Sequence, residues 1–471
     1  MKPRHLLLPP FSLLPLLFLL SSLHAQKPPT PFADGDIICC LGDSITHGGL
    51  YHKDIADFYA TRFPDRKIKV INCGIGGDTA GGALGRLDWD VLAHHPTVIT
   101  IMLGMNDVGH ANYFTDPKMP VTPEVQAARE KAIETYRAKM KEVLETIRAQ
   151  SKARLILITP SPYDESAQME GKPPRLGPNA ALGKCAQIVK ELAASFNTEL
   201  VEFWEPMNKL NAEGQKTDPK FTLCGADRVH PGAPGHLVMA DLFLQAQGVT
   251  KPLPKIELDV RAGTVSAEGA KAGNVTVGDH KWTFEITENA LPFSNILTDP
   301  NPIYTRVAAD LAGENFHADH VTDGKYRLTI DGVDVGLYRK RTLGREQVYL
   351  STSETAPQVK QAKEIIQLST ERFAQQQIIR DIARMKKILG PKVNIDDDAA
   401  FTAFADQHLA QLKPDSDAGK KWQADMKRFR DAKARQKEAQ EKIEALTTKI
   451  YQSNQPKSHT WTLEKVSGKG E

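Results

Sequence analysis

Short apolar runs alternate with longer amphipathic segments between about residues 36 and 248, and this alternation constrains the fold more than any other feature. The apolar runs have the length of strands and end at glycine, proline or polar residues, which is typical of strands buried on both faces. Strands that alternate with helices predict right-handed βαβ units and a parallel five-stranded sheet covered by helices. The five runs are Ile37–Leu41, Ile68–Asn72, Thr97–Leu103, Arg154–Thr159 and Glu199–Phe203.

The segments between these runs carry helical signals. A long helix is predicted from Thr122 to Ala149, because Thr122 is a good N-cap residue and Pro123 suits the first helical turn. Three further segments repeat apolar residues with helical spacing. They are Lys53–Arg62, Asn179–Phe196 and Gly235–Gln247.

The chain of 471 residues is too long for a single domain of ordinary size. The α/β domain is expected to cover residues 35–250. From 251 to 355 the sequence has β-type runs separated by turns such as Asp323-Gly324 and Asp331-Gly332. This pattern predicts a small antiparallel β-rich accessory module.

Residues 356–452 are rich in Ala, Gln, Lys and Glu, and they predict a helical region interrupted near Gly390-Pro391 and Pro414. Its last helix is predicted from Ala418 to Tyr451, with its charges forming a solvated face.

The tail, residues 453–471, repeats a pattern of the β module. His459–Glu464 reads HTWTLE and resembles His280–Glu285, which reads HKWTFE. Both are alternating strand patterns with a Trp on one face. We therefore expect the tail to return to the β module as a strand, and chance similarity of two β-rich hexamers is the alternative.

The first 25 residues have the pattern of a secretory signal peptide. Basic residues precede the apolar run Leu6–Leu20, and small or polar residues lead to a cleavage site after Ala25. Three prolines interrupt the run, which argues against a permanent membrane anchor. The mature protein is thus expected to be secreted or periplasmic, with residues 26–34 as a linker.

Charge and cysteine content exclude some classes of function. A net charge of +2 gives no reason to expect nucleic acid or an anionic membrane as a partner. An odd number of cysteines, five, predicts buried thiols more than a disulfide framework. No cluster of His, Asp and Glu has the spacing of a metal site, so no metal is expected. The sequence does not predict an oligomeric state.

The first apolar run ends abruptly at Gly42-Asp43-Ser44. Ser44 therefore stands at the carboxyl end of a core strand, where open α/β sheets place their ligand sites. An ordinary polar turn is the alternative for this tripeptide alone. Asp43 and also Asp107, which follows the third run, are expected to bond loop backbone rather than to act in chemistry.

Three further blocks follow in order along the chain. The second run leads to Gly76-Gly77-Asp78-Thr79, whose glycines let backbone amides approach a ligand closely. The third run is followed by Asn106, and Asp227-Arg228-Val229-His230 precedes the last helix of the domain. Positions three apart in a turn or helix share a face, so the Asp227 carboxylate can meet the His230 ring.

These four blocks resemble those of the SGNH hydrolases, also called the GDSL esterase/lipase family, over about residues 36–248. The resemblance implies a three-layer α/β/α sandwich of flavodoxin-like type. It also implies the nucleophile Ser44, the base His230 and the acid Asp227. Its oxyanion hole would consist of the backbone N–H groups of Ser44 and Gly77 and the side-chain amide of Asn106, with Gly76 as a competitor for the glycine role. No cofactor is implied.

The expected activity is that of a secreted serine esterase acting on O-acyl esters, most of all O-acetyl groups on carbohydrates. Its partner would be an acylated small molecule or glycan. Alternatives within the family are a lipase, lysophospholipase or arylesterase, and no broad apolar lid segment is evident in the sequence. A non-catalytic glycan-binding or scaffold protein is the alternative from another class.

Overall fold

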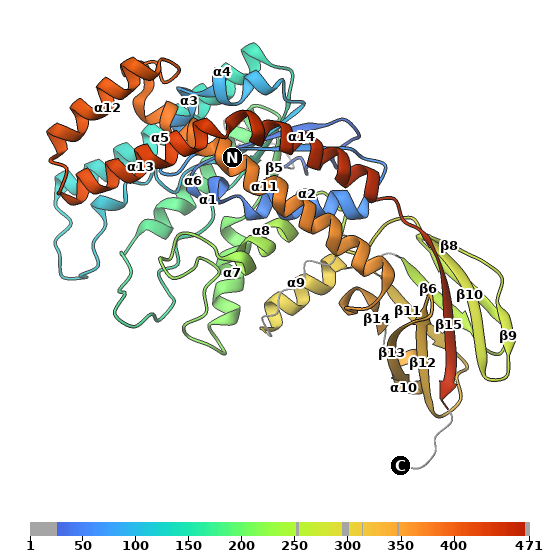
Figure 1. The fold of residues 1–471 in the computed structure, drawn as a ribbon. Coiled ribbons are helices and arrows are strands. Elements are labelled where there is room, and N and C mark those ends of the chain that lie inside the picture. Colours follow the sequence, from blue (N-terminus) through green and yellow to red (C-terminus); the bar gives the residue numbers. More distant parts are fainter. Residues whose placement is uncertain (1–25, 251–253, 294–300, 313, 346–347, 467–471) are drawn as a thin grey trace, which may run out of the picture.

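The computed structural model of the protein describes residues 26–250, 254–293, 301–312, 314–345 and 348–466 (Figure 1). The predicted signal peptide, residues 1–25, lies outside the described residues. No helix within these ranges is both long and apolar enough to cross a membrane.

A five-stranded parallel sheet forms the centre of the N-terminal domain, in the strand order β2-β1-β3-β4-β5. Leu41 of β1 aligns with Cys73 of β2 on one side and with Ile101 of β3 on the other. The predicted sheet is confirmed, because each predicted run contains or overlaps one of its strands. The strands are β1 (Ile37–Gly42), β2 (Lys69–Gly74), β3 (Val98–Met102), β4 (Arg154–Ile158) and β5 (Glu199–Val201).

Helices cover this sheet, as expected for an α/β/α sandwich. Helix α2 packs against α8, while α5 packs against α3 and α6. The Thr122 side chain caps α5 by accepting a hydrogen bond from Val125 N–H. The helices are α1 (Ser44–Gly48), α2 (Leu50–Arg62), α3 (Ala80–Leu84), α4 (Leu87–Asp90), α5 (Pro123–Gln150), α6 (Pro178–Ser195), α7 (Trp204–Gly214) and α8 (Ala233–Ala246).

Residues 26–34, predicted as a linker, pack against this domain. The Phe32 side chain is buried, and its ring centroid lies 5.1 Å from that of Tyr59 and 5.9 Å from that of Phe243. The Thr30 hydroxyl donates to Glu199 at 2.9 Å. The prediction of a linker is therefore wrong, because one aromatic side chain among the prolines provides enough apolar surface to anchor the segment.

The β-rich module contains two sheets. The six-stranded sheet has the order β13-β12-β15-β10-β8, and its sixth strand, β9, also pairs with β10. The four-stranded sheet has the order β14-β11-β6-β7. Their strands are β6 (Lys255–Asp259), β7 (Thr264–Glu268), β8 (Ala270–Ala272), β9 (Thr276–Gly278), β10 (Lys281–Glu288), β11 (Asn315–Asp319), β12 (Lys325–Ile330), β13 (Val333–Arg339), β14 (Val348–Tyr349) and β15 (Ser458–Val466).

The module is not purely antiparallel, because β6 and β11 pair in parallel. Parallel pairing requires a long crossover connection, and the chain between these strands includes helix α9 (Pro302–Ala312). This helix was not predicted from the sequence. Its apolar side chains, including Tyr304 and Leu311, pack into the core of the N-terminal domain beside α8.

The chain then leaves the module as a set of helices and returns to it (Figure 1). The prediction of one last helix from Ala418 to Tyr451 is wrong, since the helix breaks at Arg435. Helix α13 packs with both α12 and α11 around Trp422 and Phe429, and α14 continues along α11. The helices are α11 (Pro357–Leu389), α12 (Asp398–Leu412), α13 (Asp417–Ala434) and α14 (Gln436–Ser453).

Candidate active site

Ser44 is held at the carboxyl edge of the central sheet by a tight connection from β1 to α1. Asp43 caps α1, and its carboxylate accepts a hydrogen bond from Ile45 N–H at 3.0 Å. A Cβ atom at Gly42 would lie 2.1 Å from Thr46 Oγ1 and 2.8 Å from Met102 O, closer than atoms can approach. Glycine is therefore required at position 42, just where the strand turns into the short helix.

The structure brings Ser44, His230 and Asp227 into one hydrogen-bonded chain. Ser44 Oγ lies 2.7 Å from His230 Nε2, and His230 Nδ1 lies 2.6 Å from Asp227 Oδ2. The carboxylate can only accept, so Nδ1 carries a proton and Nε2 accepts from the Ser44 hydroxyl. The His230 and Asp227 side chains are 49% and 56% exposed, so the group faces solvent.

Asp227 is positioned by its own turn. Its Oδ1 atom accepts hydrogen bonds from the backbone N–H groups of Val229, at 3.0 Å, and His230, at 2.9 Å. Partial burial raises the pKa of Asp227, but these backbone bonds and the bond from the His230 ring outweigh burial and keep that pKa below its ordinary value. The carboxylate is thus ionised and oriented toward the imidazole.

Arg228 lies between Asp227 and His230 in the sequence. It has a structural role that the sequence analysis did not identify. Its backbone is in the left-handed region, with φ of 68°, and its side chain is buried. The guanidinium donates to the carbonyls of Asp164 (3.0 Å), Ala167 (2.9 Å) and Lys172 (2.6 Å). These bonds tie the loop after β4 to the segment that carries His230.

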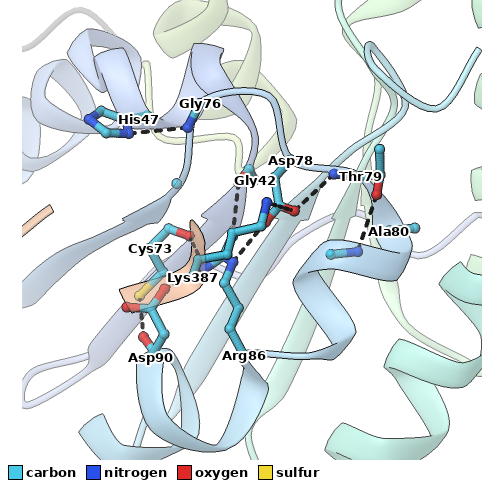
Figure 2. Close-up of polar contacts among 12 residues, drawn as sticks. Gly42, His47, Cys73, Gly76, Asp78, Thr79, Ala80, Arg86, Asp90 and Lys387 are labelled. Carbon is cyan, nitrogen blue, oxygen red and sulfur yellow. Dashed lines mark hydrogen bonds and ion pairs between the residues drawn. The ribbon is translucent and has the colours of Figure 1, made fainter. Parts of the chain in front are cut away.

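The loop after β2 presents two glycines with different roles. Gly76 N–H donates to His47 Nδ1 at 3.2 Å (Figure 2). Burial lowers the pKa of His47 to about 4, so the ring is neutral and can accept this bond. Gly77 has φ of 75°, and within the described chain its N–H group makes no hydrogen bond. Of the two glycines, only Gly77 keeps a free backbone donor.

Asn106, after β3, is linked to this loop. Its side-chain Nδ2 donates to the backbone carbonyl of Asp78 at 2.9 Å, and Asp78 directly follows Gly77. One hydrogen of the Asn106 amide is used in this bond, and the other is free for a ligand. Two of the donors expected from the sequence are the Gly77 N–H group and the Asn106 amide. They are therefore linked through a single residue, Asp78.

The other two acidic candidates bond loop backbone. Asp43 caps α1, and Asp107 accepts from Ala80 N–H at 2.9 Å. Burial raises the pKa of Asp43 to about 7 and that of Asp107 to about 6.

The five cysteines are free and buried. Throughout the described ranges, no group of three or more His, Cys, Asp or Glu side chains is arranged to hold a metal ion.

Comparison with known sequences places this domain in a family. The sequence model of the GDSL-like lipase/acylhydrolase family matches residues 40–238, the part that carries all four blocks. Among curated proteins, an acetylxylan esterase from Geobacillus stearothermophilus is 26% identical over 229 residues, which cover 45% of this chain and 94% of that relative.

Comparison with solved structures extends the similarity beyond this domain. A gut microbial diltiazem-metabolizing enzyme has a TM-score of 0.82 and 27% identity, covering 93% of this chain and 100% of that chain. Axe2, an acetylxylan esterase from Geobacillus stearothermophilus, has a TM-score of 0.36 and 24% identity over 46% of this chain and 95% of its own. The β-rich module and the helices thus recur in the first of these structures. The domain of residues 40–238 thus matches the GDSL-like lipase/acylhydrolase family, the SGNH hydrolases, and the protein is a carboxylic ester hydrolase.

Proposed function

We propose that the protein is a serine esterase that hydrolyses O-acetyl esters with Ser44, His230 and Asp227 as its catalytic triad. The observation that carries this proposal is the continuous chain of short hydrogen bonds from Ser44 Oγ through the imidazole to the Asp227 carboxylate. A serine hydroxyl is a weak nucleophile at neutral pH, and an adjacent oriented base activates it.

In the acylation step, His230 Nε2 takes the proton of the Ser44 hydroxyl while Oγ forms a bond to the ester carbonyl carbon. The carbonyl π electrons move to oxygen, which becomes the oxyanion of a tetrahedral intermediate. When this intermediate collapses, the bond to the alcohol oxygen breaks and the leaving alkoxide takes the proton from His230. An acetyl-Ser44 ester and a free alcohol result.

In the deacylation step, water replaces the alcohol. His230 takes one proton from water as the hydroxyl adds to the acetyl carbon, and it returns the proton to Ser44 Oγ as the ester bond breaks. Acetic acid is released and loses its proton to solvent. Throughout, Asp227 keeps the ring in the required tautomer and stabilises the imidazolium.

The oxyanion would be stabilised by the N–H groups of Ser44 and Gly77 and the amide of Asn106. Support comes from Gly77, whose N–H group is free in the described chain, whereas that of Gly76 is bonded to His47. Each such donor contributes roughly 3–4 kcal/mol of transition-state stabilisation.

An acetylated carbohydrate is the first candidate substrate. The curated relative is described as an acetylxylan esterase, and it matches this chain over the domain that carries the triad. The half-exposed His230 and Asp227 side chains leave room for a large alcohol such as a sugar chain. The whole-chain similarity to a diltiazem-metabolizing enzyme favours a second candidate, a small non-sugar acyl ester.

Export is also proposed, on the signal pattern of residues 1–25. N-terminal sequencing of protein recovered from the periplasm or medium of an expressing bacterium is expected to begin at or within two residues of Gln26. Retention in the cytoplasm with an intact N-terminus would contradict export.

The decisive experiment compares the wild-type protein with Ser44→Ala on p-nitrophenyl acetate. The substitution removes the nucleophile from a half-buried position at the start of α1, so we expect hydrolysis to fall to background while the melting temperature stays the same. Retained turnover would overturn the proposed triad.

A substrate panel then separates the candidates. We would compare p-nitrophenyl acetate with the octanoate, and acetylated xylo-oligosaccharides with diltiazem, by kcat/KM and by acetate release. Preference for acetylated oligosaccharide supports the carbohydrate substrate, preference for diltiazem supports a small non-sugar ester, and preference for octanoate contradicts an acetyl esterase.

A further inference from the structure

The long helix α11 lies outside residues 40–238, yet it reaches into the proposed site. Lys387, in its last turn, forms an ion pair with Asp78 Oδ1 (Figure 2). Asp78 belongs to the loop after β2 and directly follows Gly77. A residue of the C-terminal helical region therefore contacts the loop that carries a proposed oxyanion donor.

Asp78 is fully buried and its carboxylate is held from several sides. Its Oδ1 atom accepts from Thr79 N–H at 2.9 Å in addition to Lys387, and its Oδ2 atom accepts from Arg86 Nε at 2.7 Å. Two cationic side chains thus fix both oxygens of one carboxylate. Charge-assisted bonds of this kind are strong and directional, so the rotamer and backbone of Asp78 are fixed with them.

The position of Asp78 determines the position of two proposed donors. Gly77 is its neighbour in the chain, so the Gly77 N–H group moves with the same loop. Asn106 Nδ2 donates to the Asp78 carbonyl at 2.9 Å, and this bond sets the orientation of the amide. A small displacement of Asp78 would misalign both donors at once.

Helix α11 also holds the beginning of this loop. Arg380 Nε donates to the Gly74 carbonyl at 3.1 Å, and its two terminal nitrogens bind Asp90 at 2.6 and 2.8 Å. Gln377 donates to the carbonyl of His47 at 3.1 Å, and the ring of His47 accepts from Gly76. The helix therefore contacts both ends of the loop, and Lys387 is its contact nearest to Gly77 along the chain.

We propose that Lys387 is a positioning residue of the esterase: its ammonium holds the Asp78 carboxylate so that Gly77 N–H and the Asn106 amide are aligned for the oxyanion. The inference rests on the proposed function, because it assigns those two groups as donors. It gives the C-terminal helical region a role in catalysis beyond packing.

The test uses the full-length protein with Lys387→Met and Lys387→Arg. Methionine retains much of the aliphatic length but removes the charge, and arginine restores a cation. Lys386→Met is the matched control, because Lys386 is the neighbouring residue, is exposed, and lies over the Trp89 ring instead. For p-nitrophenyl acetate we expect kcat of Lys387→Met to fall roughly tenfold or more with little change in KM, since misplaced donors weaken transition-state binding.

Lys387→Arg is expected to recover at least half of the kcat that Lys387→Met loses. Lys386→Met is expected to have the same kcat as the wild type. A second readout is inhibition by phenylboronic acid, which forms a tetrahedral adduct on an active serine. The affinity of Lys387→Met for phenylboronic acid is expected to fall by a factor similar to the fall in kcat. Loss of packing alone would not weaken this inhibitor while leaving KM unchanged.

An unchanged kcat in Lys387→Met, or an equal fall in Lys386→Met, would overturn the inference. If Lys387→Met does not fold, Lys387→Gln takes its place, because it removes the charge and retains a polar end. Failure of the proposed function is a separate result, since it appears as wild-type protein without Ser44-dependent hydrolysis.

Discussion

Phe284 of β10 pairs with Trp461 of β15 in antiparallel register, and their ring centroids lie 6.1 Å apart. The Trp461 ring also lies 5.6 Å from that of Phe316, which belongs to the other sheet of the module. The tail strand therefore joins the two sheets through one core. Because α11 leaves this module and α14 returns to it, the helical region that carries Lys387 is anchored at both of its ends.

Trp461 is expected to be essential for the stability of the module. Its side chain is fully buried, so Trp461→Ala should lower the free energy of unfolding by about 3–5 kcal/mol. Trp461→Phe is the matched comparison, because it retains an aromatic ring and removes an indole N–H that has no partner among the described residues. We expect a much smaller loss for phenylalanine, measured by chemical denaturation. Equal losses for the two variants would contradict this account.

Local patterns predicted the parts of the fold that depend on local physics. Buried parallel strands are continuous apolar runs, so the ends of β1 to β5 were predicted to within two residues, and the capping signal of Thr122 located α5. The four blocks of the family identified Ser44, Asp227 and His230, and the structure brings these three into contact.

Contacts between distant segments leave no such pattern. Phe32 was predicted to lie in a proline-rich linker because its partners, Tyr59 and Phe243, come from two different helices, one of them near the end of the domain. A lysine such as Lys387 in a charged helix is ordinarily a solvated side chain, and only the three-dimensional fold places it against Asp78.

The buried carboxyl group of Asp241 is expected to make stability depend on pH. Burial raises its pKa from 3.8 to about 7, while Oδ2 accepts from Gln245 and Oδ1 has no partner within the described chain. The folded state thus retains a proton that the unfolded state loses, so this contribution to stability is complete below pH 4 and is lost as pH rises through 7.

Asp241→Asn removes this titration. The free energy of unfolding of the variant, minus that of the wild type, should therefore increase as pH rises from 4 to 8. The total increase should be on the order of 1–4 kcal/mol. Urea denaturation at several pH values measures the difference, and Asp65→Asn, at an exposed position outside α8 and α9, is the control. A difference between variant and wild type that does not change with pH would refute the assignment.

The cysteines are expected to be unreactive in the native protein. Burial raises the pKa of Cys40 and of Cys224 to about 12, so neither forms the thiolate that reacts with disulfide reagents. Titration with Ellman's reagent should detect no thiol in the folded protein and five in denaturant without reductant. Three thiols in denaturant would reveal a disulfide and contradict the structure.

Asn106 offers the most direct test of the oxyanion hole. If its free amide hydrogen binds the oxyanion, Asn106→Ala should lower kcat on p-nitrophenyl acetate by ~100–1,000-fold with KM nearly unchanged, because the bond forms fully only in the transition state. Asn106→Asp keeps the size and shape of the side chain but cannot donate when ionised, so it should lose at least as much activity. Circular dichroism and melting temperature establish that both variants fold. A folded Asn106→Asp with wild-type kcat would remove Asn106 from the oxyanion hole, and the amide would then serve only to hold the Asp78 carbonyl.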